Sequence, residues 1–271
     1  MTTYSKRRNT AAFYGFNAPK SDLFEFSGMR FPRSFSLLAP SACPYLAGEE
    51  ERKLVAWLGE RADVSDFSAL NRRGFRRSHD FIYKPFCGGC KACKALRVQA
   101  KDFLPGRTQR RIYKTNDDLE LKICPNEATD EQYDLFHAYV TRRHYAGGMS
   151  AMDRNDFKMM IEESGVETSL FEWRQKESSE LLACCLVDSL DDGFSAVYSF
   201  FDPDYVKRSL GVYMILSLIE FTQKFGMPYV YLGFWVRGSE KMDYKSLYKP
   251  CQILEEGEWR DFDANEDINL A

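Results

Sequence analysis

The spacing of hydrophobic and polar positions changes near the middle of the 271-residue chain. From residue 119 onward, apolar runs and alternating segments predict strands over 119–123, 168–175, 180–190, 194–203 and 228–236. Apolar residues at helical spacing predict helices over 129–144, 155–164 and 209–226. Thr129 or Asp130 is the expected N-cap of the first helix, and Gly226 is expected to close the last one.

The pattern is less regular before residue 119. Leu54, Val55 and Leu58 fall at helical spacing and predict a helix over 49–58. Strands are expected over 81–86 and 94–103, and a basic helix is expected to begin at residue 107. The change of pattern at 116–118 predicts a domain boundary. We therefore expect one domain over 1–118 and a second over 119–271.

These elements predict an α+β fold class. In the second domain, several strands are followed by a long helix and a further strand, which is the order of an acetyltransferase-like (GNAT) domain. The first domain is the smaller one and carries a cluster of cysteines.

Charge is distributed unevenly along the chain. The net charge is only −3, but residues 71–114 contain thirteen Lys and Arg and two acids. This asymmetry favours a polyanionic partner such as RNA for that region. The alternative is a solvated basic face whose acids come from elsewhere in the fold.

Nothing in the sequence predicts export or a membrane segment. The longest strongly apolar candidate, 212–221, is far shorter than the roughly 18 to 20 residues that a spanning helix needs. The basic N-terminal stretch lacks the continuous apolar region of a secretory signal. We therefore expect a cytoplasmic protein.

Three cysteines follow one another in a C-x-x-C-x-x-C spacing, at Cys87, Cys90 and Cys93. Cys43, before a proline in the same predicted domain, is the natural fourth ligand, with His79 as an alternative. Four soft ligands suit zinc or an iron–sulfur cluster. The alternatives are a redox C-x-x-C pair or unrelated thiols. Cys184 and Cys185 lie in an apolar run and are expected to pack in the core.

Two further segments carry candidate chemistry. Four arginines surround Gly74 and Phe75, and arginine forks bind carboxylate or phosphate bidentately. The segment 231–250 interleaves aromatic residues with lysines at a sheet edge, where a ligand or only a packed lid could lie. Arg208 and Gly211 match an acetyltransferase pyrophosphate loop, but Tyr213 would crowd a pyrophosphate there, which argues against coenzyme A as donor.

Several of these segments together resemble the bacterial aspartate/glutamate leucyltransferases of the arginyl-tRNA–protein transferase superfamily. They are "CPYLAGEEERK", "NRRGFRRSHDFIYKPFCGGCKAC", "RTQRR", "HYAGGM", "VYSFFDP", "RSLGVYMIL" and "YVYLGFWVRGSEKMDYKSLYKP". The resemblance implies a two-domain enzyme that transfers leucine from leucyl-tRNA to the N-terminal α-amine of proteins starting with Asp or Glu. It implies that these proteins are thereby marked for N-degron degradation. It implies no cofactor for the transfer itself, since an aminoacyl ester is already activated.

The resemblance also suggests roles for individual residues. The cationic candidates for binding the acidic acceptor side chain are Arg76, Arg77, Arg208, Lys241 and Lys245. Asp202 or Tyr198 could assist proton removal, although Asp202 could instead only end a strand. Trp235 and Phe234 are candidate walls for a leucine pocket. The residues expected to contact the tRNA acceptor end are Arg107, Arg110, Arg111 and Lys114.

Three other functions stay open at this point. One is the same transfer with arginyl-tRNA as donor. Another is acetyl transfer from coenzyme A, and the third is zinc-dependent RNA binding without transferase activity.

Overall fold

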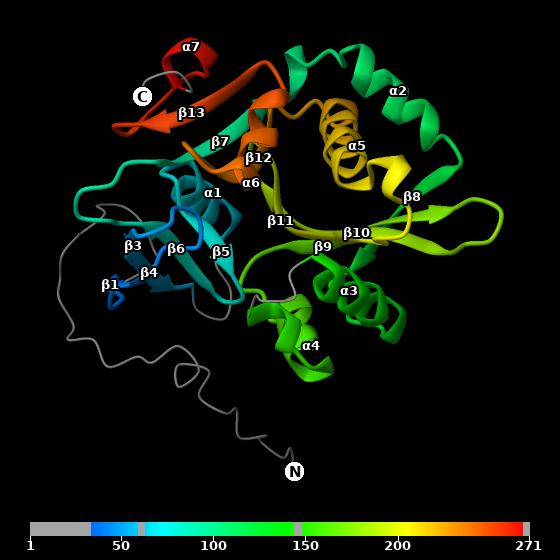
Figure 1. The fold of residues 1–271 in the computed structure, drawn as a ribbon, viewed down its shortest axis with the longest axis horizontal. Helices are drawn as coiled ribbons and strands as arrows, with labels where there is room; N and C mark the ends of the chain where they lie inside the picture. The colour runs from blue at the N-terminus through cyan, green and yellow to red at the C-terminus, as the bar shows by residue number, and fades with distance from the viewer. Residues whose placement is uncertain (1–33, 59–62, 144–147, 268–271) are drawn as a thin grey trace.

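An eight-stranded sheet forms the centre of the protein (Figure 1). The computed structural model describes residues 34–58, 63–143 and 148–267. The strand order is β14-β13-β7-β12-β11-β10-β9-β8, and every neighbouring pair is antiparallel except β11 with β12. The strands are β7 Cys93–Gln99, β8 Leu119–Pro125, β9 Thr168–Gln175, β10 Leu181–Leu190, β11 Gly193–Phe201, β12 Tyr229–Val236, β13 Cys251–Glu255 and β14 Glu258–Asp261.

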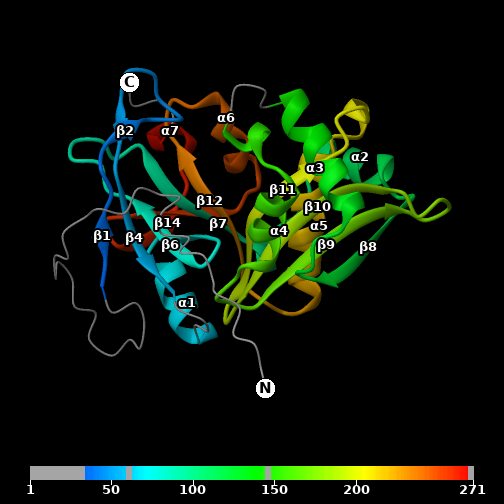
Figure 2. The ribbon, with the colours of Figure 1, turned by 90° about the horizontal axis from the view of Figure 1, so that it is seen from below.

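Helices cover both faces of this sheet (Figures 1 and 2). The long helix α5 (Leu210–Lys224), with α2 (Arg107–Thr115) beside it, lies on one face, and α3 (Asp130–Arg143) and α4 (Arg154–Glu162) lie on the other. Successive residues of a strand point to opposite faces, so a strand covered on both faces is apolar throughout. Cys184 and Cys185 show this, since each is buried in the core of a different face, as predicted.

A second, four-stranded sheet has the order β1-β4-β6-β5. Its strands are β1 Ser36–Leu37, β4 Lys53–Trp57, β5 Arg76–Ser78 and β6 Phe81–Pro85, and α1 (Val64–Arg72) packs beside it. The short strands β2 (Ser41–Ala42) and β3 (Glu50–Glu51) form a hairpin next to it.

The helix predicted over 49–58 is wrong, because this segment forms β3 and β4. In β4 the consecutive residues Leu54, Val55 and Ala56 are all buried, since the strand pairs with β1 and β6 and is covered on both faces. The apolar run therefore lacks the alternation that would have indicated a strand, and its spacing coincides with that of a helix.

The other predicted helices and strands are present. Thr129 caps α3 reciprocally with Gln132, and Gly226 follows α5 in a left-handed conformation with φ +69°. The shorter helices are η2 Ala100–Asp102, η3 Gly148–Ala151, η4 Val206–Arg208, α6 Glu240–Asp243, η5 Tyr244–Leu247 and α7 Ala264–Asp267. Most of the "HYAGGM" segment, 144–147, lies outside the described residues, as do 1–33.

The antiparallel strands β8–β11, the crossover helix α5 and the parallel strand β12 form the predicted acetyltransferase-like arrangement, which confirms the α+β fold class. Strand β7 precedes the predicted boundary at 118, yet it lies between β12 and β13 in the central sheet. The boundary itself stays a prediction. Within the described parts of the chain, no helix combines the length and the apolar character needed to cross a membrane.

Candidate active site

The two parallel strands β11 and β12 separate soon after they begin. They pair over only three positions, from Gly193 with Tyr229 to Ser195 with Tyr231. Beyond that point the guanidinium of Arg76, from β5, lies between them. Its Nη2 donates to the backbone oxygens of Ala196 and Tyr231, both at 3.3 Å. Arg76 is 6% exposed. Its hydrogen bonds connect the small sheet to the central sheet at the point where β11 and β12 separate.

A second buried cation lies at the same place. Lys245, on η5, is 7% exposed, and its Nζ donates to the backbone oxygen of Phe234 at 2.7 Å. Gly233 of β12 faces both cations. A Cβ atom built on it would lie 3.7 Å from Nε and Nη2 of Arg76 and from Nζ of Lys245. The missing side chain therefore leaves space at which both cations point.

Burial disfavours the charged form of both groups, and the charge of Arg76 adds to this effect at Lys245. Burial, and then the charge of Arg76, lowers the pKa of Lys245 to about 7. Burial also lowers the pKa of Arg76. Among the residues that the structure describes, neither cation forms an ion pair with a carboxylate. Burying two cations without a partner costs free energy, and a bound carboxylate would reduce that cost.

The four cysteines predicted as metal ligands line one small cavity beside these cations. Cys43, Cys87, Cys90 and Cys93 share it with Tyr83 and Phe234. Burial, and then the nearby thiols, raises the pKa of Cys93 to about 12. Across 34–58, 63–143 and 148–267, no group of three or more His, Cys, Asp or Glu has the geometry to hold a metal ion. The thiols thus converge without forming a coordination shell.

A larger cavity of about 650 Å³ lies on the α4 side of the central sheet. We call it the methionine cavity, because Met149, Met152, Met159 and Met160 line it together with Leu186 and Val197. Tyr83 lines this cavity as well as the cysteine cavity, and Tyr198 forms part of its wall. Burial raises the pKa of Tyr198, so its phenol stays protonated at neutral pH.

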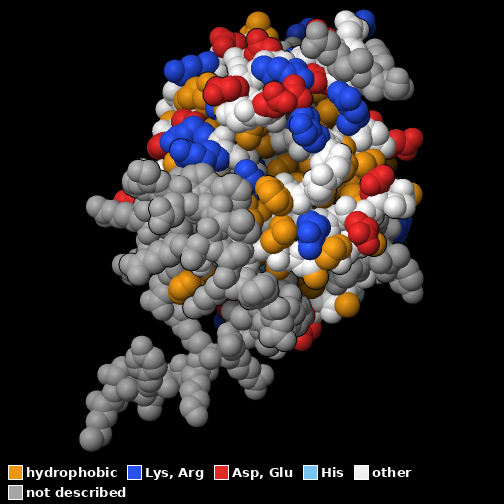
Figure 3. Space-filling model, turned by 90° about the vertical axis from the view of Figure 1, so that its left-hand side faces the viewer, with side chains coloured by type: hydrophobic (Ala, Val, Ile, Leu, Met, Phe, Trp, Pro, Cys, Tyr) orange, Lys and Arg blue, Asp and Glu red, His pale blue; other side chains and the backbone are white. Residues whose placement is uncertain are grey.

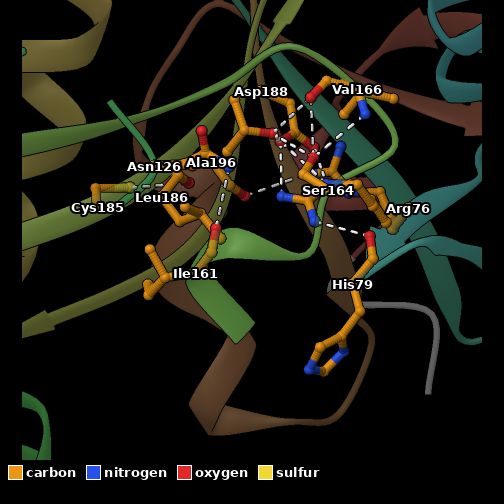
Figure 4. Close-up of polar contacts among 12 residues, drawn as sticks. Arg76, His79, Asn126, Ile161, Ser164, Val166, Cys185, Leu186, Asp188 and Ala196 are labelled. Atoms are coloured by element: carbon orange, nitrogen blue, oxygen red, sulfur yellow. Dashed lines mark hydrogen bonds and ion pairs between the residues drawn. The ribbon is translucent and has the colours of Figure 1, made fainter. Parts of the chain in front are cut away.

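Arg77 forms a buried ion pair with Asp188. Its Nε and Nη2 donate to the buried carboxylate of Asp188 on β10 at 2.8 to 3.0 Å, and its Nη1 donates to the backbone oxygen of His79. Thr168 Oγ1 also donates to Asp188, at 2.7 Å. Figure 4 shows Asp188 at the centre of this network. The pair fixes β5 against β10 and thereby positions its neighbour Arg76.

Other predicted site residues lie apart from the cationic pair. Arg208 binds both oxygens of Asp118 at 2.7 and 2.8 Å. Trp235 is 1% exposed and packs against Phe262, and it lines neither cavity. Lys241 is exposed on α6. Asp202 caps the turn after β11, since its Oδ1 accepts from the backbone of Asp204 at 2.8 Å.

The predicted tRNA-contacting residues form one exposed stripe on α2. They are Arg107, Arg110, Arg111 and Lys114, at the spacing of neighbours on one helix face. The opposite side of α2 faces α5, where the hydroxyl of Tyr113 donates to the backbone oxygen of Leu216 at 2.7 Å. The first turn of α2 contacts η5, since Gln109 Nε2 donates to Leu247 O at 3.3 Å.

Acids from the second half of the chain neutralise several other basic residues of 71–114. Arg72 pairs with Asp191, Arg77 with Asp188, and Lys94 with Glu255. Figure 3, which views the molecule from the left-hand side of Figure 1, shows Lys and Arg mixed with Asp and Glu on the described part of the surface. Part of the basic excess of the sequence is thus neutralised, and α2 carries an exposed part of it.

Two features of the site were not predicted from the sequence. Tyr83 was noted only as part of a motif, although it separates the two cavities. The methionine cavity had a visible signal, since four methionines fall within 149–160. Methionine is flexible and frequent at adaptable apolar binding surfaces.

The sequence matches both parts of one protein family. Residues 41–111 match the family described as "Arginine-tRNA-protein transferase, N terminus", and residues 131–255 match "Arginine-tRNA-protein transferase, C terminus". The aspartate/glutamate leucyltransferase of Granulibacter bethesdensis is 46% identical, over 84% of this chain and 85% of its own length. That of Parvibaculum lavamentivorans is 47% identical, over 86% of this chain and 96% of its own. Among solved structures, L-PGS from Bacillus licheniformis resembles the chain with a TM-score of 0.46 and 12% identity, covering 64% of this chain and 59% of that one, a likeness too distant to bear on function.

Proposed function

The chain belongs to the arginine-tRNA-protein transferase family, and we propose from its similarity to aspartate/glutamate leucyltransferases that it has their activity. It transfers leucine from leucyl-tRNA to the N-terminal α-amine of proteins that begin with Asp or Glu. The observation that carries the acceptor half of this proposal is the buried pair of Arg76 and Lys245, which has no carboxylate partner in the described structure. The acidic first side chain of the acceptor supplies that partner.

The same cations favour the chemical step. An α-amine has an ordinary pKa of about 7.7 to 8.0, and nearby positive charges lower it by favouring the neutral form. The amine nitrogen attacks the ester carbonyl of leucyl-tRNA and forms the peptide bond, while the bond from that carbon to the ribose oxygen breaks. The amine proton passes to the departing ribose oxygen, so the reaction needs no protein nucleophile.

Tyr198 fits a hydrogen-bonding role better than the role of a base. Its raised pKa keeps the phenol protonated, so it can donate a hydrogen bond to the developing oxyanion. Asp202, which caps a turn, does not line either cavity.

The exposed stripe on α2 is our candidate contact for the tRNA acceptor stem, since it reaches η5, which carries Lys245. We propose that the reaction takes place in the cytoplasm, where leucyl-tRNA is available. The product is a protein with N-terminal leucine, which we propose enters the N-degron pathway.

We also propose that the cysteine cavity holds a structural zinc ion or an iron–sulfur cluster. Four thiols facing one cavity are a donor set that suits either. Burial raises the pKa of the Cys93 thiol, so this thiol must release its proton on binding, as metal sites require. Bound there, the group would brace Tyr83 and Phe234 and take no part in the transfer. Elemental analysis of anaerobically purified protein tests this, and less than about half an equivalent of zinc or iron would count against it.

Paired transfer assays test the function. Purified protein is given labelled leucyl-tRNA or arginyl-tRNA, together with peptides that begin with Asp, Glu or Ala. We expect leucine transfer to the Asp and Glu peptides only, and an Arg76→Ala variant that uses them poorly. Transfer of arginine in preference to leucine would support the alternative donor. Transfer from neither tRNA, with tRNA binding retained, would support the RNA-binding alternative and overturn the proposal.

A further inference from the structure

The methionine cavity has the chemistry of an apolar side-chain pocket. Four of the residues that line it are methionines, and Leu186 and Val197 add branched apolar surface from adjacent strands. Thioether side chains are unbranched and adapt their shape to a ligand. A cavity of about 650 Å³ lies in the size range of small-molecule sites and exceeds what one leucyl side chain fills.

Residues adjacent to Arg76 line the methionine cavity, although Arg76 itself does not. Val197 follows Ala196, whose backbone oxygen binds Arg76. Tyr83 lines the cavity and is paired with Arg76 across β5 and β6. A ligand in the cavity therefore lies close to Arg76, one of the two cations of the proposed acceptor site.

Glu163 lines the cavity together with Arg77, Asp80 and Asp156, and the last three have partners outside it. Arg77 is neutralised by Asp188, and Asp80 accepts from the indole Nε1 of Trp57 at 2.9 Å. Asp156 accepts from the backbone of Asp153 at 3.1 Å and belongs to the N-terminal cap of α4. A guanidinium entering the cavity would have to compete for these carboxylates, whereas an isobutyl group meets the apolar wall directly.

We propose that the methionine cavity receives the leucyl side chain of the donor, with the terminal ribose at its mouth. This rests on the proposed leucyl transfer and assigns donor selectivity to residues that had no predicted role. It replaces Trp235, which lies in the core, as the wall of the leucine pocket. Leu186 and Val197 form the floor, and the methionines of η3 and α4 close the pocket over it.

Two substitutions of opposite sense test the assignment. Met152→Trp narrows the cavity at a half-buried position, and we expect at least about a tenfold fall in kcat/KM for leucyl-tRNA, with KM for an Asp-initiated peptide unchanged. Met159→Ala enlarges it, and we expect the ratio of kcat/KM for phenylalanyl-tRNA to that for leucyl-tRNA to rise about tenfold. The matched controls are Met227→Trp and Met227→Ala, at a half-buried methionine outside the cavity.

A stable amide analogue of leucyl-adenosine gives an independent measurement. With the unsubstituted protein, it should inhibit leucyl transfer competitively, and more strongly than the glycyl analogue. Donor ratios unchanged in Met159→Ala, or equal inhibition by the two analogues, would overturn the assignment even if Met152→Trp did not fold. Absence of leucyl transfer by the unsubstituted protein would instead reject the proposed function, so the two failures are distinguishable.

Discussion

Replacing Lys245 by methionine should stabilise the protein while it impairs the use of acidic acceptors. Burial and Arg76 lower the pKa of Lys245 from 10.5 to about 7. Each pKa unit corresponds to about 1.36 kcal/mol, so the buried ammonium destabilises the folded state by about 5 kcal/mol at pH 6. Methionine has a similar length and no charge. Its substitution also removes the hydrogen bond to Phe234 O, which costs about 1–3 kcal/mol. The expected net gain at pH 6 is therefore about 2–4 kcal/mol.

The stability advantage of Lys245→Met should decrease as the pH rises. Because the pKa is lowered on folding, the unfolded chain binds more protons between about pH 7 and 10.5, and the stability of the unsubstituted protein rises with pH across that window. At pH 9 the penalty falls to about 2 kcal/mol, so the advantage of Lys245→Met should nearly vanish. Urea unfolding at pH 6 and pH 9 measures both values.

Activity is measured on the same variant. We expect Lys245→Met to lower kcat/KM for Asp- and Glu-initiated peptides at least about tenfold, since it removes one cation from the acceptor site. Lys207→Met, at an exposed position on η4, is the control and should change neither property. A Lys245→Met variant that is less stable than the unsubstituted protein at pH 6, or equally stabilised at pH 6 and pH 9, would refute the reasoning.

Three further predictions concern other parts of the chain. Asp188→Asn should lower the free energy of unfolding by about 3–5 kcal/mol, because it leaves a buried guanidinium unpaired; in urea unfolding, Asp191→Asn at an exposed pair should cost about 1 kcal/mol or less. Arg111→Glu should raise KM for leucyl-tRNA several-fold and weaken its salt dependence, with KM for the peptide unchanged, and an unaltered salt slope would exclude α2 from the tRNA contact. Cys90→Ser should lose bound zinc or iron by elemental analysis, whereas Cys124→Ser, on β8 outside the cysteine cavity, should retain it; equal metal content in both variants would contradict the assignment.

Much of the fold could be predicted because its elements carry local signals. Alternating or continuous apolar runs marked β9–β12, and a capping pair and a terminal glycine marked α3 and α5. Strand β4 was mistaken for a helix because its alternation is lost where both faces are covered. That covering comes from segments distant in sequence, so no local pattern records it.

The site was only partly predictable for a similar reason. Arg76 and Lys245 were both candidates, and the fold brings them together over Gly233. Arg77 and Arg208 looked equivalent to Arg76 in sequence, but they are neutralised by Asp188 and Asp118. A sequence shows which residues are cationic, whereas the acid that pairs with each one depends on the tertiary structure.

The position of β7 has a consequence for how the protein can be made and divided. This strand comes early in the chain, yet both of its neighbours, β12 and β13, come near the end. A growing or truncated chain that stops before residue 229 leaves both edges of β7 open, and open strand edges promote association with other chains. The cysteine-bearing half and the acetyltransferase-like half should therefore be poor candidates for separate expression. Synthesis must reach the last strands before β7, which carries Cys93, is fixed in place.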